Sequence, residues 1–105
     1  MQILIVDLGS QYSVIIDQAL REIGYRSAIL PPEEAKKWLK LNRPKAIILS
    51  GGNTSVYEKN VPTPPKNILN KKIPVLGICY GMQWIIHSMG GEVSAKTNNE
   101  KEEKK

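Results

Sequence analysis

The sequence predicts an α/β fold, a flavodoxin-like parallel sheet of four to five strands with helices on both faces. Short apolar runs rich in β-branched residues alternate with segments of helical periodicity, and short turns containing glycine or proline join them. Right-handed crossovers connect strands in such sheets. Because ligands bind outside the carboxyl ends of parallel strands, we expect function to lie where the runs end, at residues 7–10, 50–52 and 79.

Composition indicates one ordinary soluble domain. The 105 residues are 41% hydrophobic and 24% charged, and no apolar stretch approaches the ~18 residues that a membrane helix needs. One cysteine cannot form an internal disulfide, which favours the cytoplasm. The net charge of +5 comes from scattered lysines with few aromatic neighbours, a pattern of solvated side chains that argues against nucleic acid and membrane partners.

The first half of the chain predicts two strand–helix pairs. Residues 3–7 form a buried strand, Gly9-Ser10 turns it into a helix N-cap, and Gly24 caps the helix at its end. That helix spans residues 11–23 and carries an apolar stripe of Tyr12, Ile15, Ile16, Ala19, Leu20 and Ile23. A second strand follows at 26–30, then a helix at 32–41 with Trp38 and Leu39 toward the sheet.

The second half predicts a third strand at 45–50, ended by Gly51-Gly52. Residues 53–65 are too long for a simple connection, so they form either a functional loop or an excursion before a short helix at 66–70. A fourth strand at 73–78 leads into a helix at 80–89, ended by Gly90-Gly91, and residues 92–95 can start a fifth strand. The domain therefore spans 1–95, and residues 96–105, which have no apolar side chain, form a charged, disordered tail.

Cys79 is the candidate nucleophile. Gly77 and Gly81 flank it symmetrically and allow a strand to turn sharply into a helix, which leaves the cysteine exposed on a strained corner. The unpaired N–H groups at a helix N-terminus favour negative charge there. The competing interpretation is a buried, inert cysteine whose flanking glycines only pack the helix against the strand.

Attack of the sulfur on a carbonyl carbon needs donors for the developing oxyanion. The backbone N–H groups of Tyr80 and Gly52 are the candidates. The chain has one histidine, His87, but eight residues of helix place it roughly 12 Å from Cys79, so we interpret it as a surface or packing residue rather than the base. No metal-ligand cluster or phosphate-binding loop is present in the sequence.

Three motifs together resemble the N-terminal half of class I glutamine amidotransferases, in particular the glutaminase part of GMP synthases. They are Ile5–Tyr12, Ile47–Gly52 followed by Ser55-Val56-Tyr57, and Gly77–Gln83. The resemblance covers residues 2–95 and implies that Cys79 attacks the amide of glutamine, forms a glutamyl thioester and releases ammonia. It implies that Gly51 and Gln83 contact glutamine, that Gly52 and Tyr80 serve the oxyanion, and that the Tyr57 loop lies near the site.

The resemblance also implies a partner. Ammonia would pass to an ATP-dependent synthetase domain or subunit that aminates xanthosine monophosphate to GMP in purine biosynthesis. ATP and magnesium would belong to that partner, and no cofactor is expected in this chain. Asn53 stands where the family usually has proline.

The family domain is nearly twice as long, and its later half supplies the histidine and glutamate of the triad. We therefore expect a truncated domain that is inactive or nearly so alone, with marginal stability. Its elbow helix would leave Trp84, Ile85, Ile86 or Met89 partly exposed and would invite self-association. A non-catalytic module that binds glutamine or a synthetase remains the alternative. A redox-linked relative with a cysteine elbow fits Cys79 but not the flanking motifs.

Overall fold

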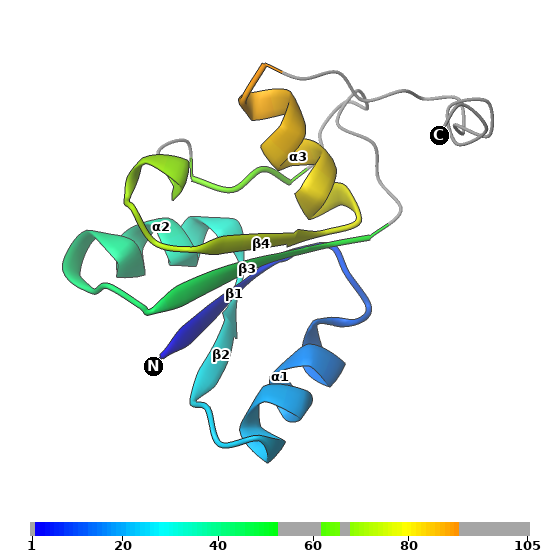
Figure 1. Cartoon of the computed structure of the whole chain (residues 1–105), viewed down its shortest axis with the longest axis vertical. Helices are drawn as coiled ribbons and strands as arrows, with labels where there is room; N and C mark the ends of the chain where they lie inside the picture. Colours follow the sequence, from blue (N-terminus) through cyan, green and yellow to red (C-terminus); the bar gives the residue numbers. More distant parts are fainter. Residues whose placement is uncertain (1, 53–61, 66–67, 91–105) are drawn as a thin grey trace.

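The computed structural model describes residues 2–52, 62–65 and 68–90. In this part of the chain, four parallel strands form one sheet in the order β2-β1-β3-β4 (Figure 1). The strands are β1 (Ile3–Leu8), β2 (Ser27–Leu30), β3 (Ala46–Gly51) and β4 (Val75–Ile78). Parallel pairing brings the carboxyl ends of the strands to one edge of the sheet. The predicted α/β fold is confirmed, and the candidate fifth strand at 92–95 lies outside the described residues.

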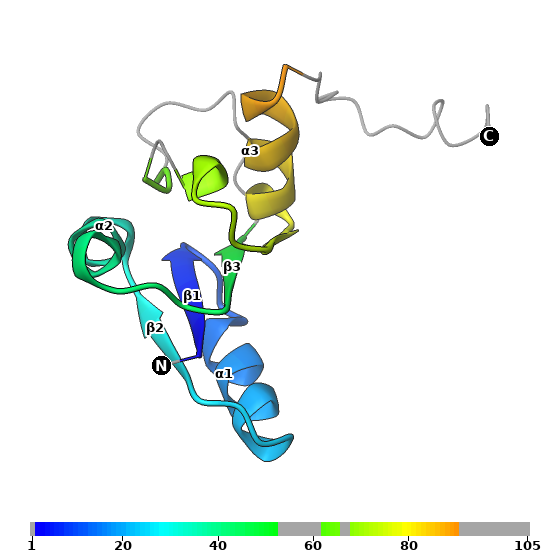
Figure 2. The ribbon, with the colours of Figure 1, turned by 60° about the vertical axis from the view of Figure 1, so that its left-hand side comes forward.

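Helices lie on both faces of this sheet (Figure 2). One face carries α1 (Ser13–Glu22), and the other carries α2 (Pro32–Leu41) and α3 (Tyr80–Ser88). The short helix expected before the fourth strand is a single 3₁₀ turn, η1 (Ile68–Asn70). The first turn of α2 contains Pro32 and two glutamates. Proline suits this position because the first N–H groups of a helix have no partner within the helix, and the negative carboxylates interact favourably with the positive end of the helix dipole.

The hydrophobic core fills the face covered by α2 and α3. Alternate residues of β1 and β3 point into it, as the two-residue period of a strand requires, and α2, η1 and α3 close it. Full burial of one such aliphatic side chain contributes about 1.5–3 kcal/mol. The buried members are Leu4, Val6, Leu8, Ala35, Leu39, Ile47, Leu49, Ile68, Ile73 and Tyr80. Trp38 and Leu39 lie toward the sheet, as predicted.

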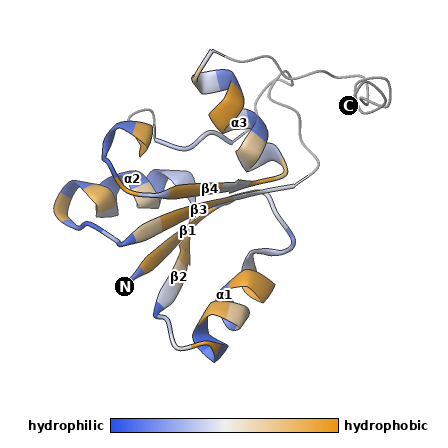
Figure 3. Ribbon diagram, in the orientation of Figure 1, coloured by the Kyte–Doolittle hydropathy of each residue, from blue (hydrophilic) through white to orange (hydrophobic). Residues whose placement is uncertain are grey.

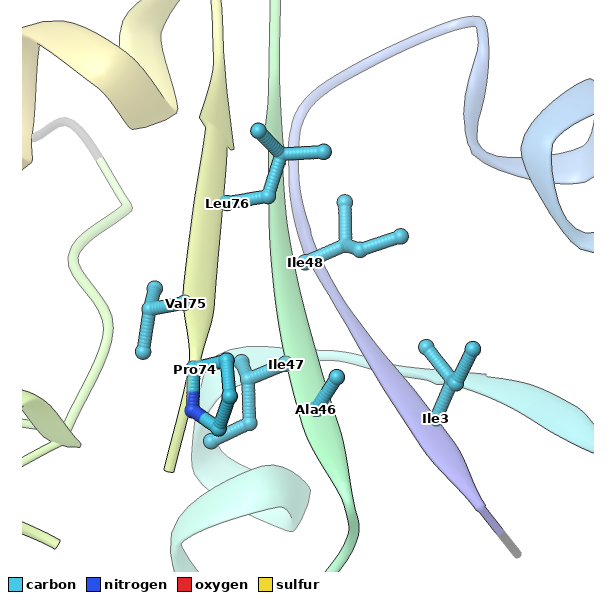
Figure 4. Close-up of a pocket in the computed structure, with 7 residues that line it drawn as sticks. All are labelled: Ile3, Ala46, Ile47, Ile48, Pro74, Val75 and Leu76. Atoms are coloured by element: carbon cyan, nitrogen blue, oxygen red, sulfur yellow. The ribbon is translucent and has the colours of Figure 1, made fainter. Parts of the chain in front are cut away.

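The opposite face is covered only in part. There, Ile3, Ile48 and Leu76 point to one side of the sheet and line an apolar hollow of about 230 Å³ (Figure 4), and Leu76 is 59% exposed. A surface of this kind favours association with another apolar surface. The self-association expected of this chain stays a prediction.

The apolar stripe of α1 is mostly exposed, contrary to what its spacing suggests. Ile16 and Leu20 are partly buried, but Ile15 and Ile23 are 60% and 69% exposed, and apolar residues show on the outer side of α1 (Figure 3). The reason is that α1 packs mainly against the edge strand β2, so one narrow side of the helix meets the sheet. Ile86 on α3 and Met89 just after it are exposed, as expected. Trp84 and Ile85 are half-buried against the core.

The start of α1 is also a correction. The helix begins at Ser13, two residues later than predicted, and Ser10 is not its N-cap. The Asp7 carboxylate accepts hydrogen bonds from the N–H groups of Gly9 and Ser10, and the Ser10 hydroxyl accepts one from the Tyr12 N–H. These bonds hold residues 9–12 in turns, because short polar side chains compete with the helix for backbone donors.

The end of α1 matches the prediction. Gly24 has φ +99°, a conformation that suits a residue without a Cβ. Its N–H donates to the Arg21 carbonyl, and the Tyr25 N–H donates to the Leu20 carbonyl at 2.9 Å. This pair of bonds is the Schellman ending of a helix. Among the described residues, no helix is long and apolar enough to cross a membrane.

Candidate active site

Cys79 occupies a sharp corner between β4 and α3. Its backbone dihedral angles are φ 54° and ψ −119°, a combination that residues with a Cβ rarely adopt. The side chain is exposed, and the Cys79 carbonyl accepts hydrogen bonds from the N–H groups of Met82 and Gln83, which start the helix. The predicted strained, exposed elbow is therefore present, and the interpretation of Cys79 as a buried cysteine is wrong. The reactivity of its sulfur stays a prediction.

Glycines make this corner possible by close packing. A Cβ built on Gly81 would lie 2.1 Å from the Leu49 carbonyl oxygen, and one built on Gly77 would lie 2.7 Å from the Gly81 carbonyl carbon. Contacts this short do not occur for real Cβ atoms, because they lie far inside van der Waals distance. The first turn of α3 therefore rests directly on the backbone of β3.

The turn after β3 lies between the elbow and the β1 loop. A Cβ on Gly51 would lie 2.5 Å from Tyr80 Cβ, and one on Gly52 would lie 2.7 Å from the Gly9 carbonyl oxygen. Gly9 and Gly51 also form an isolated bridge between the two segments. The three strand-end motifs singled out in the sequence are thus brought together at one edge of the sheet.

A small hollow opens beside Gly52. It measures about 110 Å³ and is lined by Gly9, Gln11, Tyr12 and Gly52. It lies at the carboxyl ends of β1 and β3, where parallel α/β sheets bind their ligands. Gln11 and Tyr12 belong to the first motif of the sequence, but we did not predict them as lining residues, because their spacing alone gives no sign of which way a loop side chain faces.

The sequence match agrees with this geometry. Residues 4–105 match the family described as "Glutamine amidotransferase class-I". The chain belongs to that family. Similar curated proteins include the glutamine-hydrolyzing GMP synthases of Treponema denticola (46% identical), Thermosipho melanesiensis (44%) and Borrelia garinii subsp. bavariensis (51%). These alignments cover 94%, 93% and 88% of this chain but 19%, 19% and 17% of the relatives, so the amidotransferase chain spans about a fifth of their length.

The residues singled out in the sequence divide into three groups. Gly51, Gly52, Tyr80 and Cys79 lie together at the elbow. Gln83 lies one turn into α3 and is half-buried, and His87 lies in the last turn, at the other end of the helix from Cys79. Tyr57, with Asn53 and the rest of its loop to residue 61, lies outside the described residues.

Asp17 makes contacts that join two elements of the fold. Its carboxylate pairs with Arg21 at 3.1 Å, one turn along α1, and accepts a hydrogen bond from the Ser27 hydroxyl at 2.5 Å. These contacts tie α1 to β2. In the described part of the amidotransferase chain, no group of three or more His, Cys, Asp or Glu side chains could hold a metal ion.

Burial raises the pKa of the Tyr80 hydroxyl, because the ionised form would lose its hydration. A tyrosine in the unfolded chain ionises near pH 10. The contribution of Tyr80 to stability is therefore complete below about pH 10 and is lost as the pH rises toward the higher pKa of the folded state.

Replacing Tyr80 with phenylalanine should remove this loss of stability at high pH, because phenylalanine does not ionise. Above about pH 10, the unfolding free energy of the natural chain should fall more steeply with pH than that of Tyr80→Phe, by up to about 1.4 kcal/mol per pH unit. Urea denaturation at a series of pH values measures the difference, and Tyr25→Phe, at an exposed tyrosine, is the matched control. Parallel curves for the natural chain and Tyr80→Phe would contradict the prediction.

Proposed function

We propose that Cys79 is the nucleophile of a glutamine amidotransferase. Its sulfur attacks the carboxamide carbon of glutamine and the carbon–nitrogen bond breaks. The nitrogen takes up the proton that the thiol has lost and leaves as ammonia, and a glutamyl thioester remains. Water then hydrolyses the thioester and releases glutamate. The observation that carries this proposal is the strained backbone of Cys79, φ 54° and ψ −119°, at the N-terminus of α3. A backbone conformation of this kind costs about 1–3 kcal/mol, and residues that adopt it cluster at active sites.

The neighbouring backbone suits this chemistry. The N–H groups of Tyr80 and Gly52 would donate to the oxyanion of the tetrahedral intermediate, and one such donor typically contributes a factor of about 10²–10³ to the rate. Gly51 holds the Gly52 turn against the elbow by close contact with Tyr80 and Gly81. Gly51 and Gln83 would contact the bound glutamine, which enters from the edge that carries the hollow beside Gly52.

The ammonia would serve an ATP-dependent synthetase. The similarity to glutamine-hydrolyzing GMP synthases supports the amination of xanthosine monophosphate to GMP, with the synthetase as a separate domain or subunit. ATP and magnesium would bind there. The chain would act in the cytoplasm.

Among the residues that the structure describes, no histidine lies near Cys79 to act as a base. The single histidine is eight residues further along α3, roughly 12 Å away along the helix axis. We therefore propose that the chain alone binds and traps glutamine analogues but turns glutamine over poorly. A non-catalytic role in binding glutamine or a synthetase is the second candidate, and the same observation favours it.

Labelling of the cysteine tests the nucleophile. A chloromethyl ketone analogue of glutamine should alkylate Cys79 of the full chain, with loss of chloride, at least about tenfold faster than chloroacetone does, because binding positions the carbonyl next to the sulfur. Cys79→Ala should abolish labelling. Intact-mass spectrometry measures both rates, and labelling no faster than that of a free thiol such as glutathione would contradict the proposal.

Two further measurements separate the candidates. Selective labelling with slow ammonia release from glutamine supports an amidotransferase site that lacks its base. Calorimetric binding of glutamine without selective labelling supports the non-catalytic module. Absence of both would contradict both candidates.

A further inference from the structure

Three hydrogen-bonded polar side chains connect β1, α1 and β3 next to the Gly51-Gly52 turn. Asp7 and Ser50 are register partners on neighbouring strands, and Ser13, the first residue of α1, lies against both. The Ser13 hydroxyl oxygen is 3.3 Å from Asp7 Oδ1 and 3.1 Å from Ser50 Oγ. Ser50 is fully buried and Ser13 is 3% exposed, so water cannot easily replace these contacts.

The direction of these hydrogen bonds follows from the chemistry of the three side chains. An ionised carboxylate can only accept hydrogen bonds, and a hydroxyl has one proton to donate. The Ser13 O–H therefore donates to Asp7, and the Ser50 O–H donates to the Ser13 oxygen. Asp7 Oδ1 also accepts the N–H groups of Gly9 and Ser10, at 3.0 and 3.1 Å. One oxygen of Asp7 thus holds the loop after β1. Through Ser13, the same oxygen also holds Ser50, the residue that precedes the Gly51-Gly52 turn.

The turn itself is confined on both sides. Its Gly52 backbone packs on the Gly9 carbonyl, and its Gly51 backbone packs on the first turn of α3. The loop that presents Gly9 is the one that Asp7 holds, with Gly9 at φ +95°. A change in the three polar side chains would therefore move the backbone on which Gly52 rests.

We propose that Asp7, Ser13 and Ser50 form a positioning relay that aligns the Gly52 N–H with the oxyanion at Cys79. This inference rests on the proposed function. None of the three side chains needs to touch glutamine. An oxyanion donor must sit within a few tenths of an ångström of its productive position, so a relay of this kind affects the reaction more than it affects the fold.

The test compares two reagents on the same sulfur. The sulfur adds to the ketone carbonyl of the glutamine analogue, and an oxyanion develops there before the neighbouring carbon loses chloride to the sulfur. Iodoacetamide instead alkylates the sulfur in one step, with displacement of iodide, and develops no oxyanion. Ser13→Ala should slow the ketone by about tenfold and change the iodoacetamide rate by less than about twofold, because a displaced donor loses part of its effect. Ser13→Thr, which keeps the hydroxyl, should restore the ketone rate.

Two more variants complete the design. Ser50→Ala breaks the relay from the other side and should reproduce the Ser13→Ala result, which keeps the test valid if one variant folds poorly. Ser27→Ala is the matched control, because Ser27 is as buried as Ser13 and its hydroxyl also donates to an aspartate, Asp17, but it lies in β2, away from the elbow. This substitution should leave both rates unchanged.

The outcomes are distinct. Equal slowing of both reagents, or no change in either serine-to-alanine variant of the relay, would overturn the positioning role while leaving Cys79 as the nucleophile. A natural chain that reacts with the glutamine ketone no faster than with chloroacetone would overturn the proposed function and this inference with it.

Discussion

Gly81→Ala should destabilise the fold by about 3 kcal/mol or more, although alanine is the better helix former. The added Cβ would meet the Leu49 carbonyl oxygen at 2.1 Å and the Leu49 carbonyl carbon at 2.8 Å. Both atoms belong to the backbone of β3, which pairs with β1 and β4, so they cannot move without loss of sheet hydrogen bonds. Urea denaturation followed by circular dichroism measures the change.

Gly24→Ala is the matched control for that substitution. Gly24 has φ +99° but open space around its Cα, so alanine there should cost only about 1–2 kcal/mol of backbone strain. A Gly81→Ala chain that is as stable as Gly24→Ala would show that α3 does not rest on β3 as closely as described. It would also remove the packing argument for the elbow.

Cys79→Gly should be more stable than Cys79→Ala by about 1 kcal/mol, while both variants lose labelling at this position. Glycine adopts φ 54° and ψ −119° without the strain of about 1–3 kcal/mol that a Cβ imposes. This gain exceeds the extra conformational entropy that glycine loses on folding, about 0.5–1 kcal/mol. Unfolding free energies from urea titrations of the two variants give the difference directly.

An exposed helix position should show the opposite order. Lys36 lies in α2 with an ordinary helical environment, so Lys36→Ala should be more stable than Lys36→Gly by about 1 kcal/mol. If Cys79 followed the same order as Lys36, the elbow would carry no backbone strain. The structural argument for a functional cysteine would then fail.

Much of the fold could be predicted because its signals are local. The run Ile3–Leu8 is apolar and β-branched, Gly24 has the position of a helix cap, and Pro32 opens a helix. Gly77 and Gly81 around one cysteine indicated the elbow, and the structure confirms its backbone. The roles of Gly52, Tyr80 and Gln83 toward glutamine stay predictions, which the labelling experiments test.

Other features depend on packing that no short window contains. The stripe on α1 has helical spacing, yet Ile15 and Ile23 are exposed, because the position of α1 over β2 decides which side is buried. Ser13 carried no signal of its own. It became part of a relay only because parallel pairing sets Asp7 beside Ser50.

The sequence by itself therefore determined the strand and helix order, the glycine-flanked cysteine and the family to which the chain belongs. Each of these depends on residues close together in the chain, whose backbone preferences and periodicity act locally. Only the tertiary structure decided that the first turn of α3 rests on β3, that Gly51 and Gly52 lie between Gly9 and Tyr80, and that one serine links two strands. Except for Ser13 and Asp7, which are six positions apart, those contacts join residues more than twenty-five positions apart, and packing geometry, rather than local preference, sets their distances.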